Sequence, residues 1–275
     1  MGKTLEENIL EDLKKTGYPT EIVSAAVMEF HGWAVLHNPS YLDDTEHRSR
    51  EFDIRAYRTI WQTVGDRKYS FGIYLMTECK KSDKPWVFFT TPEHHTRDDR
   101  LGRIIKCLFG GNQLFTDNSN PQSLIPDLEL RSFHHYFKPG RLARTFHQPL
   151  KGKSESDHSQ MIYSAIMSSI KATLFMLREH GESSWVQIFY PVVVFSGPLF
   201  EAQVDSNKSI QLTPSEYLQL SFHYIGADEH EFRVDIVHED YLDRFLTLVE
   251  DEHQALAECL ESALRRDIEK TRTPR

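Results

Sequence analysis

The sequence predicts an α/β protein in which a mixed β-sheet is flanked by helices. Residues 20–31 carry apolar side chains at helical spacing, and two runs between 52 and 76 read as strands joined by a turn. Residues 159–178 form a strongly apolar helix, and 185–195 form a continuous β-branched and aromatic run, which is typical of a strand covered on both faces. We expect the 275 residues to form one domain, 1–275.

Two helices are expected at the N-terminus. Residues 5–16 give a polar amphipathic helix that stops at Gly17. Thr20 is expected as the N-cap of the second helix, because its hydroxyl can accept from a free backbone N–H group. The apolar face of that second helix is formed by Ile22, Val23, Ala26, Val27 and Phe30.

The strands follow these helices. The sheet is expected to begin at Trp33, and the strand 52–57 is prolonged by 60–64. Residues 65–68 are a turn signal that leads into the run 71–76, so a hairpin is expected here. The short apolar run 86–89 is the next predicted strand.

The remaining chain divides into an insertion and a second part of the core. Residues 91–156 are rich in glycine and proline, and we expect a mostly irregular insertion there, between core segments 18–90 and 157–268. After the strand 185–195, residues 199–202 are expected to return as its hairpin partner. A strand at 232–237 and a long helix at 241–268 complete the prediction.

Composition limits the class of protein. No stretch is apolar enough for a membrane span, and the first residues lack the apolar region of a signal peptide. The three cysteines Cys79, Cys107 and Cys259 have no paired spacing, which argues against a zinc knuckle or a disulfide framework. We therefore expect a protein of the reducing cytoplasm.

The charge is acidic overall, with a formal net charge of −9. Duplex-binding proteins are usually basic, so binding of nucleic acid would require locally grouped basic residues. The middle of the chain supplies such groups: Lys80, Lys81, Lys84, Arg97, Arg100, Arg103, Lys106, Arg131, Lys138, Arg141, Arg144, Lys151 and Lys153. The series from Arg97 to Lys106, taken alone, is better explained as a solvated helix face.

The most informative motif ends the second hairpin strand. Glu78 and Lys80 lie two positions apart, so in a strand both side chains point to the same face, and Cys79 points to the other. If the loop is Gly65–Asp66, counting back along both strands places Asp53 directly opposite Glu78, with Cβ atoms roughly 5 Å apart. Two carboxylates so close repel each other, and a divalent cation is the usual solution.

Asp53 followed by Glu78-Cys79-Lys80 resembles the core of the PD-(D/E)xK nuclease superfamily, especially its resolvase-like and Mrr-like members. Glu21 stands where such members carry an accessory acidic residue. Phe52 replaces the proline of the motif's name. The resemblance covers residues 20–89 well and implies a restriction-endonuclease-like sheet core.

The resemblance also implies an activity, namely metal-dependent endonucleolytic hydrolysis of phosphodiester bonds, most readily in DNA, with Mg²⁺ or Mn²⁺. Asp53, Glu78 and the backbone carbonyl of Cys79 would bind the metal, and Glu21 would do so through water. Lys80 would orient the attacking water or stabilise the developing charge. Lys81, Lys84 and Gln160 are expected to contact the nucleic acid, and cleavage of both strands would favour a homodimer.

Three alternatives remain open. Asp53, Glu78 and Lys80 could form a surface salt-bridge cluster at a sheet edge, and Glu21 could simply complement the dipole of its helix. The chain could be a catalytically silent relative that binds nucleic acid or protein. It could also be a metal-dependent RNase.

Overall fold

The computed structural model describes residues 3–64, 67–93, 104, 107–110, 130–138, 140–149, 159–179, 186–226 and 229–272. Among the predicted basic groups, Arg97, Arg100, Arg103, Lys106, Lys151 and Lys153 lie outside the described residues.

Helices and strands are mixed along the chain, as expected for an α/β protein. The helices are α1 (Leu5–Lys15), α2 (Tyr18–Phe30), α5 (Leu130–Phe133), α6 (Gln160–Glu179) and α7 (Leu242–Arg272), with a 3-10 turn at Glu239–Tyr241. The strands are β1 (Ala34–His37), β2 (Ser40–Asp43), β3 (Arg48–Glu51), β4 (Ile54–Val64), β5 (Arg67–Lys81), β6 (Trp86–Glu93), β7 (Phe109–Gly110), β8 (Gly140–His147), β9 (Val186–Ser196), β10 (Leu199–Val204), β11 (Ile210–Pro214), β12 (Tyr217–Ile225) and β13 (Glu229–His238).

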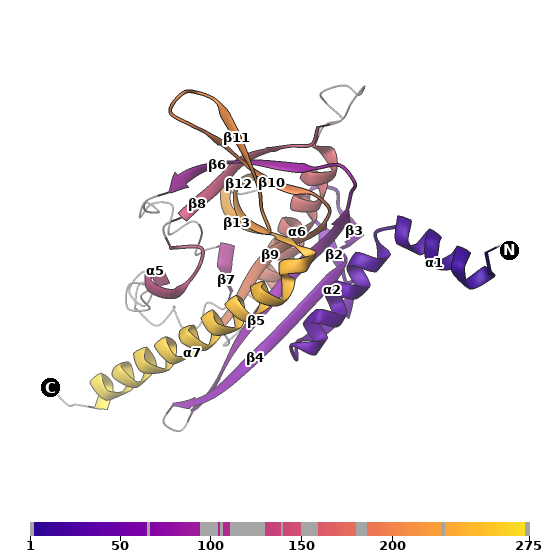
Figure 1. The fold of residues 1–275 in the computed structure, drawn as a ribbon. Helices are drawn as coiled ribbons and strands as arrows, with labels where there is room; N and C mark the ends of the chain where they lie inside the picture. The colour runs from indigo at the N-terminus through magenta and orange to yellow at the C-terminus, as the bar shows by residue number, and fades with distance from the viewer. Residues whose placement is uncertain are drawn as a thin grey trace.

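One large mixed sheet organises the molecule (Figure 1). Its order is β1-β4-β5-β9-β13-β12-β8-β6-β10-β11, and β7 pairs with β9 beside this path. The pairs β5–β9 and β9–β13 are parallel, whereas β4–β5 and β12–β13 are antiparallel. Strands β2 and β3 form a separate small hairpin. The predicted mixed sheet with flanking helices is therefore confirmed.

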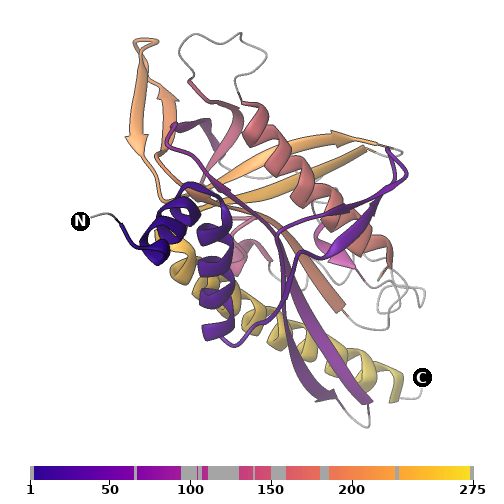
Figure 2. The ribbon, with the colours of Figure 1, turned by 90° about the vertical axis from the view of Figure 1, so that its right-hand side faces the viewer.

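Helices cover both faces of the sheet around β9. Its alternating residues Ile188, Tyr190 and Val192 belong to the same core cluster as side chains of α2 and α7. The neighbouring residues Val193 and Phe195 pack instead with α6. Figure 2 shows α6 on one side of the central strands, with α2 and α7 on the other. This two-sided cover explains why β9 is apolar without alternation.

The β4–β5 hairpin has the register expected from the sequence. Val64 pairs with Arg67, and the pairing continues without a bulge to Ile54 opposite Thr77. A one-residue slip would have moved every side chain to the other face. Asp53 is the next residue beyond the last pair, so it enters the structure beside Glu78.

Helix α2 differs from the prediction at its start and in its orientation. Gly17, not Thr20, precedes the helix, and Pro19 lies in its first turn, where the missing N–H costs nothing. The buried face consists of Thr20, Glu21, Ser24, Ala25 and Met28, whereas most of the predicted apolar face is exposed to solvent. Only Val27 of that predicted face packs against the core.

One strand prediction is wrong. Residues 199–202 do not return beside β9; β10 runs parallel to β6 and antiparallel to β11. Between β9 and β10 only glycine fits at position 197, because φ is +154° and a Cβ there would lie 2.1 Å from the Ser82 carbonyl oxygen. Within the segment 91–156, which the sequence predicts to be mostly irregular, the strand β8 lies inside the sheet between β12 and β6.

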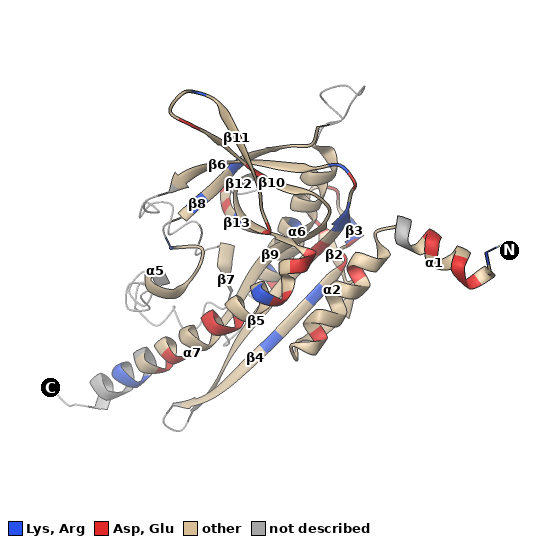
Figure 3. Ribbon diagram, viewed as in Figure 1, with Lys and Arg blue, Asp and Glu red and all other residues tan. Residues whose placement is uncertain are grey.

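Charges are unevenly distributed over the elements (Figure 3). Acidic residues recur along α1 and α7, and basic residues appear on β4 and on the β3 region. No helix among the described residues is long and apolar enough to cross a lipid bilayer.

Candidate metal and phosphodiester site

Glu78 and Lys80 lie on one face at the end of β5, as their spacing predicts. Lys80 Nζ donates to Glu78 Oε1 at 2.6 Å and to the Cys79 carbonyl oxygen at 3.2 Å. Burial opposes the charge on Lys80, but the carboxylates of Glu78 and Asp53 outweigh it and raise the pKa of Lys80. The ammonium group is therefore held in its charged form between acidic groups.

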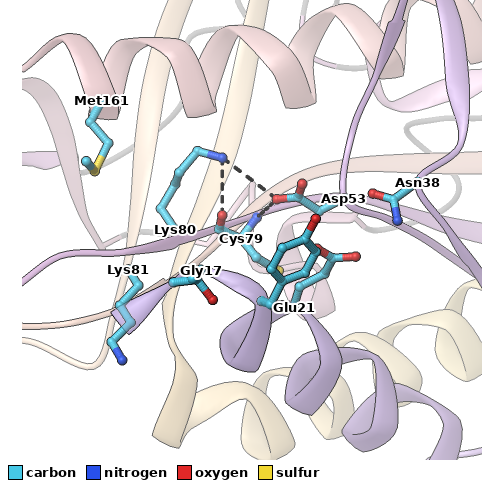
Figure 4. A pocket seen from close by; sticks show the side chains of 10 residues that line it. Gly17, Glu21, Asn38, Asp53, Cys79, Lys80, Lys81 and Met161 are labelled. Carbon is cyan, nitrogen blue, oxygen red and sulfur yellow. Dashed lines mark hydrogen bonds and ion pairs between the residues drawn. The ribbon is translucent and has the colours of Figure 1, made fainter. Parts of the chain in front are cut away.

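Asp53, which directly precedes β4, lies beside Lys80. Its Oδ2 accepts a hydrogen bond of 2.6 Å from the Cys79 backbone N–H and lies 3.8 Å from Lys80 Nζ. These contacts are drawn in Figure 4, where Lys80 extends toward α6 and Asp53 approaches from the other strand. The structure thus brings Asp53 together with Glu78 and Lys80, which lie 25 and 27 residues further along the sequence.

Glu78 is enclosed on the α6 side of the sheet. Ser168 Oγ donates to Glu78 Oε2 at 2.9 Å, and Ser168 also hydrogen-bonds Tyr41 of the β2–β3 hairpin. Glu78 is only 8% exposed. Burial, followed by repulsion from Asp53, raises the pKa of Glu78 even though Lys80 opposes the change.

Cys79 points the opposite way, as predicted. It is buried among α2 and core residues, and its thiol hydrogen-bonds Ser24. Burial and the nearby Asp53 raise the pKa of the Cys79 thiol. The thiol is thus inert packing, and only the backbone N–H and carbonyl groups of Cys79 take part in the site.

Glu21 approaches Asp53 from α2. Burial and then repulsion from Asp53 raise the pKa of Glu21, and a hydrogen bond from Asn38 acts in the opposite direction. Asn38 adopts a left-handed conformation with φ 47°, which asparagine tolerates better than most residues. Its backbone N–H donates to the Asp53 carbonyl oxygen at 2.9 Å, so Asn38 ties Glu21 to the end of β4.

Glu21, Asp53, Cys79 and Lys80 open into a cavity of about 400 Å³, whereas Glu78 is not among its lining residues. It is lined by Thr16, Gly17, Tyr18, Glu21, Asn38, Asp53, Cys79, Lys80, Lys81 and Met161. The predicted contact Lys81 therefore lies at the cavity. Lys84 and Gln160 are exposed and are not among the lining residues; Lys84 lies in the β5–β6 turn and Gln160 begins α6.

Sequence reasoning missed several residues that shape the site. Asn38 precedes Pro39, and an Asn-Pro pair indicates a turn but predicts no contact with Glu21. Ser168 gave no signal, because a serine inside a helix has no distinguishing spacing. Tyr18, at the start of α2, and Met161, in the first turn of α6, also line the cavity, and neither was expected there.

The donor set fits a hard divalent cation. Three carboxylates, those of Glu21, Asp53 and Glu78, meet one ammonium group, so the group carries an excess of negative charge. Lys80 Nζ contacts oxygen atoms of Glu78 and Cys79, as a cation in this place would. Oxygen donors of this kind suit Mg²⁺ and Mn²⁺.

A second cluster of potential ligands is already satisfied by hydrogen bonds. His134, His135 and Glu252 are buried, with ligand atoms within 4.8 Å of one another. His135 Nδ1 lies 2.5 Å from Glu252 Oε2, and the His134 ring contacts the Tyr136 N–H and the Tyr190 hydroxyl. These contacts account for the cluster as a polar part of the core.

Comparisons of the chain with protein-family models, with curated proteins and with solved structures give no match.

Proposed function

We propose that the protein is a metal-dependent nuclease that hydrolyses phosphodiester bonds in DNA. The observation that carries this proposal is the position of Lys80 Nζ, which contacts Glu78 Oε1 and the Cys79 carbonyl oxygen and lies 3.8 Å from Asp53 Oδ2. These groups meet at the end of two paired strands beside an open cavity. A salt-bridge cluster at a sheet edge would not need a third carboxylate or a cavity.

Each residue has a distinct part in this proposal. Asp53, Glu78 and the Cys79 carbonyl would hold Mg²⁺ or Mn²⁺, and Glu21 would hold it through water. Such an ion supplies Lewis-acid chemistry, which polarises the phosphate and lowers the pKa of water. Lys80, kept charged by its acidic neighbours, would stabilise negative charge that develops on the phosphate oxygens.

DNA is proposed as substrate because Lys80 and Lys81 line the cavity, and such ammonium groups attract a phosphate backbone. The acidic residues of α7 (Figure 3), which contributes no residue to the lining, would repel a polyanion there. We also propose the cytoplasm as compartment, since none of Cys79, Cys107 and Cys259 forms a disulfide with another described residue.

The test is cleavage of supercoiled plasmid by the purified protein with Mg²⁺ or Mn²⁺, beside an EDTA control. The variants Asp53→Asn, Glu78→Gln and Lys80→Met change charge with little change of shape, and each is expected to abolish cleavage. Lys208→Met is the matched control, because Lys208 lies in the β10–β11 turn at the far end of the sheet. It should cut like the wild type.

The outcomes separate the alternatives. Metal-dependent nicking or linearisation that is lost in all three variants would support the proposal. Cleavage of an RNA substrate but not of DNA would mean that the substrate is RNA and not DNA. If neither substrate is cut and calorimetry detects no metal binding, the protein is a silent binding module, and the proposal is wrong.

A further inference from the structure

The outer half of the β4–β5 hairpin carries two aromatic side chains on one face. Tyr57 and Trp61 lie four positions apart on β4, so their side chains point to the same side of the sheet, about 13 Å apart along the strand. Tyr57 is 39% exposed and Trp61 is 51% exposed. Thr59 lies between them on this face, paired with Gly72 of β5, so small residues separate the two rings.

Tyr57 is held at the surface by a stack of rings that begins in the core. Phe189 on β9 is fully buried, Tyr74 on β5 stacks on it with ring centroids 4.9 Å apart, and Tyr57 stacks on Tyr74 at 5.7 Å. The partner of Tyr57 on its other side is Ala34 of β1, whose methyl group is too small to cover a ring. The ring of Tyr57 is therefore oriented before any ligand binds, and part of it faces solvent.

Trp61 lies beyond the part of β4 that pairs with β1. This pairing runs from Ile54 to Tyr57. Lys68 is exposed, and its Nζ lies 4.6 Å from the centroid of the Trp61 ring, which is a cation–π contact. An aromatic ring and an ammonium group therefore reach solvent together at this end of the hairpin.

A second positive charge lies beside the rings. Arg55 is two positions before Tyr57 and shares its face. Its Nη1 donates to the Met176 sulfur at 3.7 Å, and its Nε has no hydrogen-bond partner among the described residues. No carboxylate occurs in β4, or in β5 before Glu78, although the whole chain has a net charge of −9 (Figure 3). This face therefore favours an anionic ligand.

We infer that the ring face, formed by Arg55, Tyr57, Trp61 and Lys68, binds single-stranded DNA. Unpaired bases would stack on the two rings, and the two cations would contact phosphate groups. In a duplex each base is covered by its neighbours, so exposed rings select an unpaired strand. Stacking of this kind is tolerant of sequence, because every base has a π-face.

The ring face is separate from the proposed metal site, although both lie on the same side of the sheet. Tyr74, which supports Tyr57, precedes Lys80 on β5 by six positions, so their side chains share a face about 20 Å apart. Met76, between them, is buried against α6 and the β2–β3 hairpin. Binding at the ring face therefore requires neither a metal nor cleavage, and only the choice of DNA over RNA rests on the proposed function.

The test is binding of a fluorescein-labelled oligothymidylate of about 15 nucleotides to the full chain, measured by fluorescence anisotropy in EDTA. The wild type is expected to bind it, and Tyr57→Ala and Trp61→Ala should each weaken binding roughly tenfold. Tyr57→Phe and Trp61→Phe keep a ring and should bind nearly like the wild type. The control is Phe30→Ala, which removes an aromatic side chain that is 90% exposed but lies on α2, and it should bind like the wild type.

Arg55→Met tests the role of the charge. It should weaken binding and lower the slope of log Kd against log salt concentration by about one. Arg58→Met is the matched control on the same strand, because Arg58 points to the opposite face and pairs with Glu250 at 3.1 Å. It should leave both the affinity and the salt slope unchanged. Circular dichroism checks the folding of every variant.

Tryptophan fluorescence reports on the ring face directly. Trp33 and Trp86 are buried, so quenching by unlabelled oligothymidylate should be clearly smaller in Trp61→Phe than in the wild type. A wild type that does not bind at about 100 µM would overturn the inference. Alanine variants that bind like the wild type, or a duplex of the same length that binds as tightly, would overturn it too.

The remaining outcomes separate this inference from the proposed nuclease. Binding of the matching RNA oligomer but not of DNA would overturn the choice of DNA. If plasmid stays uncut while oligothymidylate binds through the rings, the ring face is supported and the nuclease is not. If plasmid is cut and oligothymidylate does not bind, the ring face is refuted and the nuclease stands.

Discussion

Ser168 on α6 donates a hydrogen bond of 2.9 Å to Oε2 of Glu78 on β5, while Lys80 binds the other oxygen of the same carboxylate. Ser168 thereby fixes the orientation of a proposed metal ligand without contacting the cavity. A hydrogen bond to a charged group contributes about 1.5–3 kcal/mol. Ser168→Ala should therefore lower the single-turnover rate of DNA cleavage roughly 10- to 100-fold.

If Ser168 positions Glu78, further results are expected. Ser168→Thr keeps the hydroxyl and should recover most of the rate. Ser164→Ala is the matched control, because Ser164 lies on the exposed side of the same helix and its Oγ donates to the Met161 carbonyl oxygen. Ser168→Ala should also require more Mn²⁺ for half-maximal cleavage. An unchanged metal requirement would remove Ser168 from the support of Glu78.

Lys80 occupies a place that suits a cation, so its removal should favour metal binding. Lys80→Met takes away an ammonium group 2.6 Å from Glu78 and 3.8 Å from Asp53 and leaves their charges uncompensated. We expect tighter Mg²⁺ binding by isothermal titration calorimetry, by about tenfold, together with loss of cleavage. Lys84→Met, in the exposed β5–β6 turn, should bind Mg²⁺ like the wild type. Weaker binding in Lys80→Met would show that the carboxylates hold the lysine and not a metal.

The negative charge of Glu21 should destabilise the folded state of the metal-free protein. Burial and repulsion by Asp53 raise the pKa of Glu21 above its usual value, so its ionised form is disfavoured in the folded state. This penalty is absent below the usual pKa and appears as the pH rises through the raised pKa. In EDTA at pH 7, Glu21→Gln should raise Tm by about 2–4 °C.

The control for Glu21 is Glu29→Gln, an exposed carboxylate on the same helix, which should leave Tm unchanged. Added Mg²⁺ should stabilise the wild type more than Glu21→Gln. Equal Tm values for wild type and Glu21→Gln in EDTA would mean that the Glu21 charge is already compensated.

The central hairpin could be predicted from the sequence because residues close together in the chain determine its register. Once Gly65–Asp66 is taken as the loop, the register of β4 and β5 follows residue by residue, and it places Asp53 next to Glu78 and Lys80. The same alternation predicted that Cys79 is buried. These features depend only on contacts within a single hairpin. They can therefore be worked out from the sequences of its two strands.

Features that depend on distant parts of the chain could not be predicted. The apolar row of Ile22 and Phe30 indicated the core-facing side of α2, but that side is exposed, because the side facing the site must carry Glu21 and Ser24. Strand β10 pairs with β6 across more than a hundred residues of sequence. Strand β8 also pairs with β6, across about fifty residues. Ser168 meets Glu78 across 90 residues.

His135 should make stability depend on pH in the alkaline range. Burial alone would lower its pKa, but the carboxylates of Asp235 and Glu252 outweigh burial and raise the pKa of His135 from 6.5 to about 9. A raised pKa means that the stabilisation is complete below pH 6.5 and is lost as the pH rises through 9. The loss should be roughly 3 kcal/mol at most.

Urea unfolding at pH 6.5 and at pH 9.5 measures this loss directly. His135→Gln removes the charge that links Asp235 on β13 and Glu252 on α7, so it should be less stable than the wild type at pH 6.5 and change less between the two pH values. The control is His223→Gln, since the ion pair of His223 with Glu229 is about half exposed and contributes little. If His135→Gln keeps the pH dependence of the wild type, the alkaline loss arises elsewhere, and the buried imidazole is neutral.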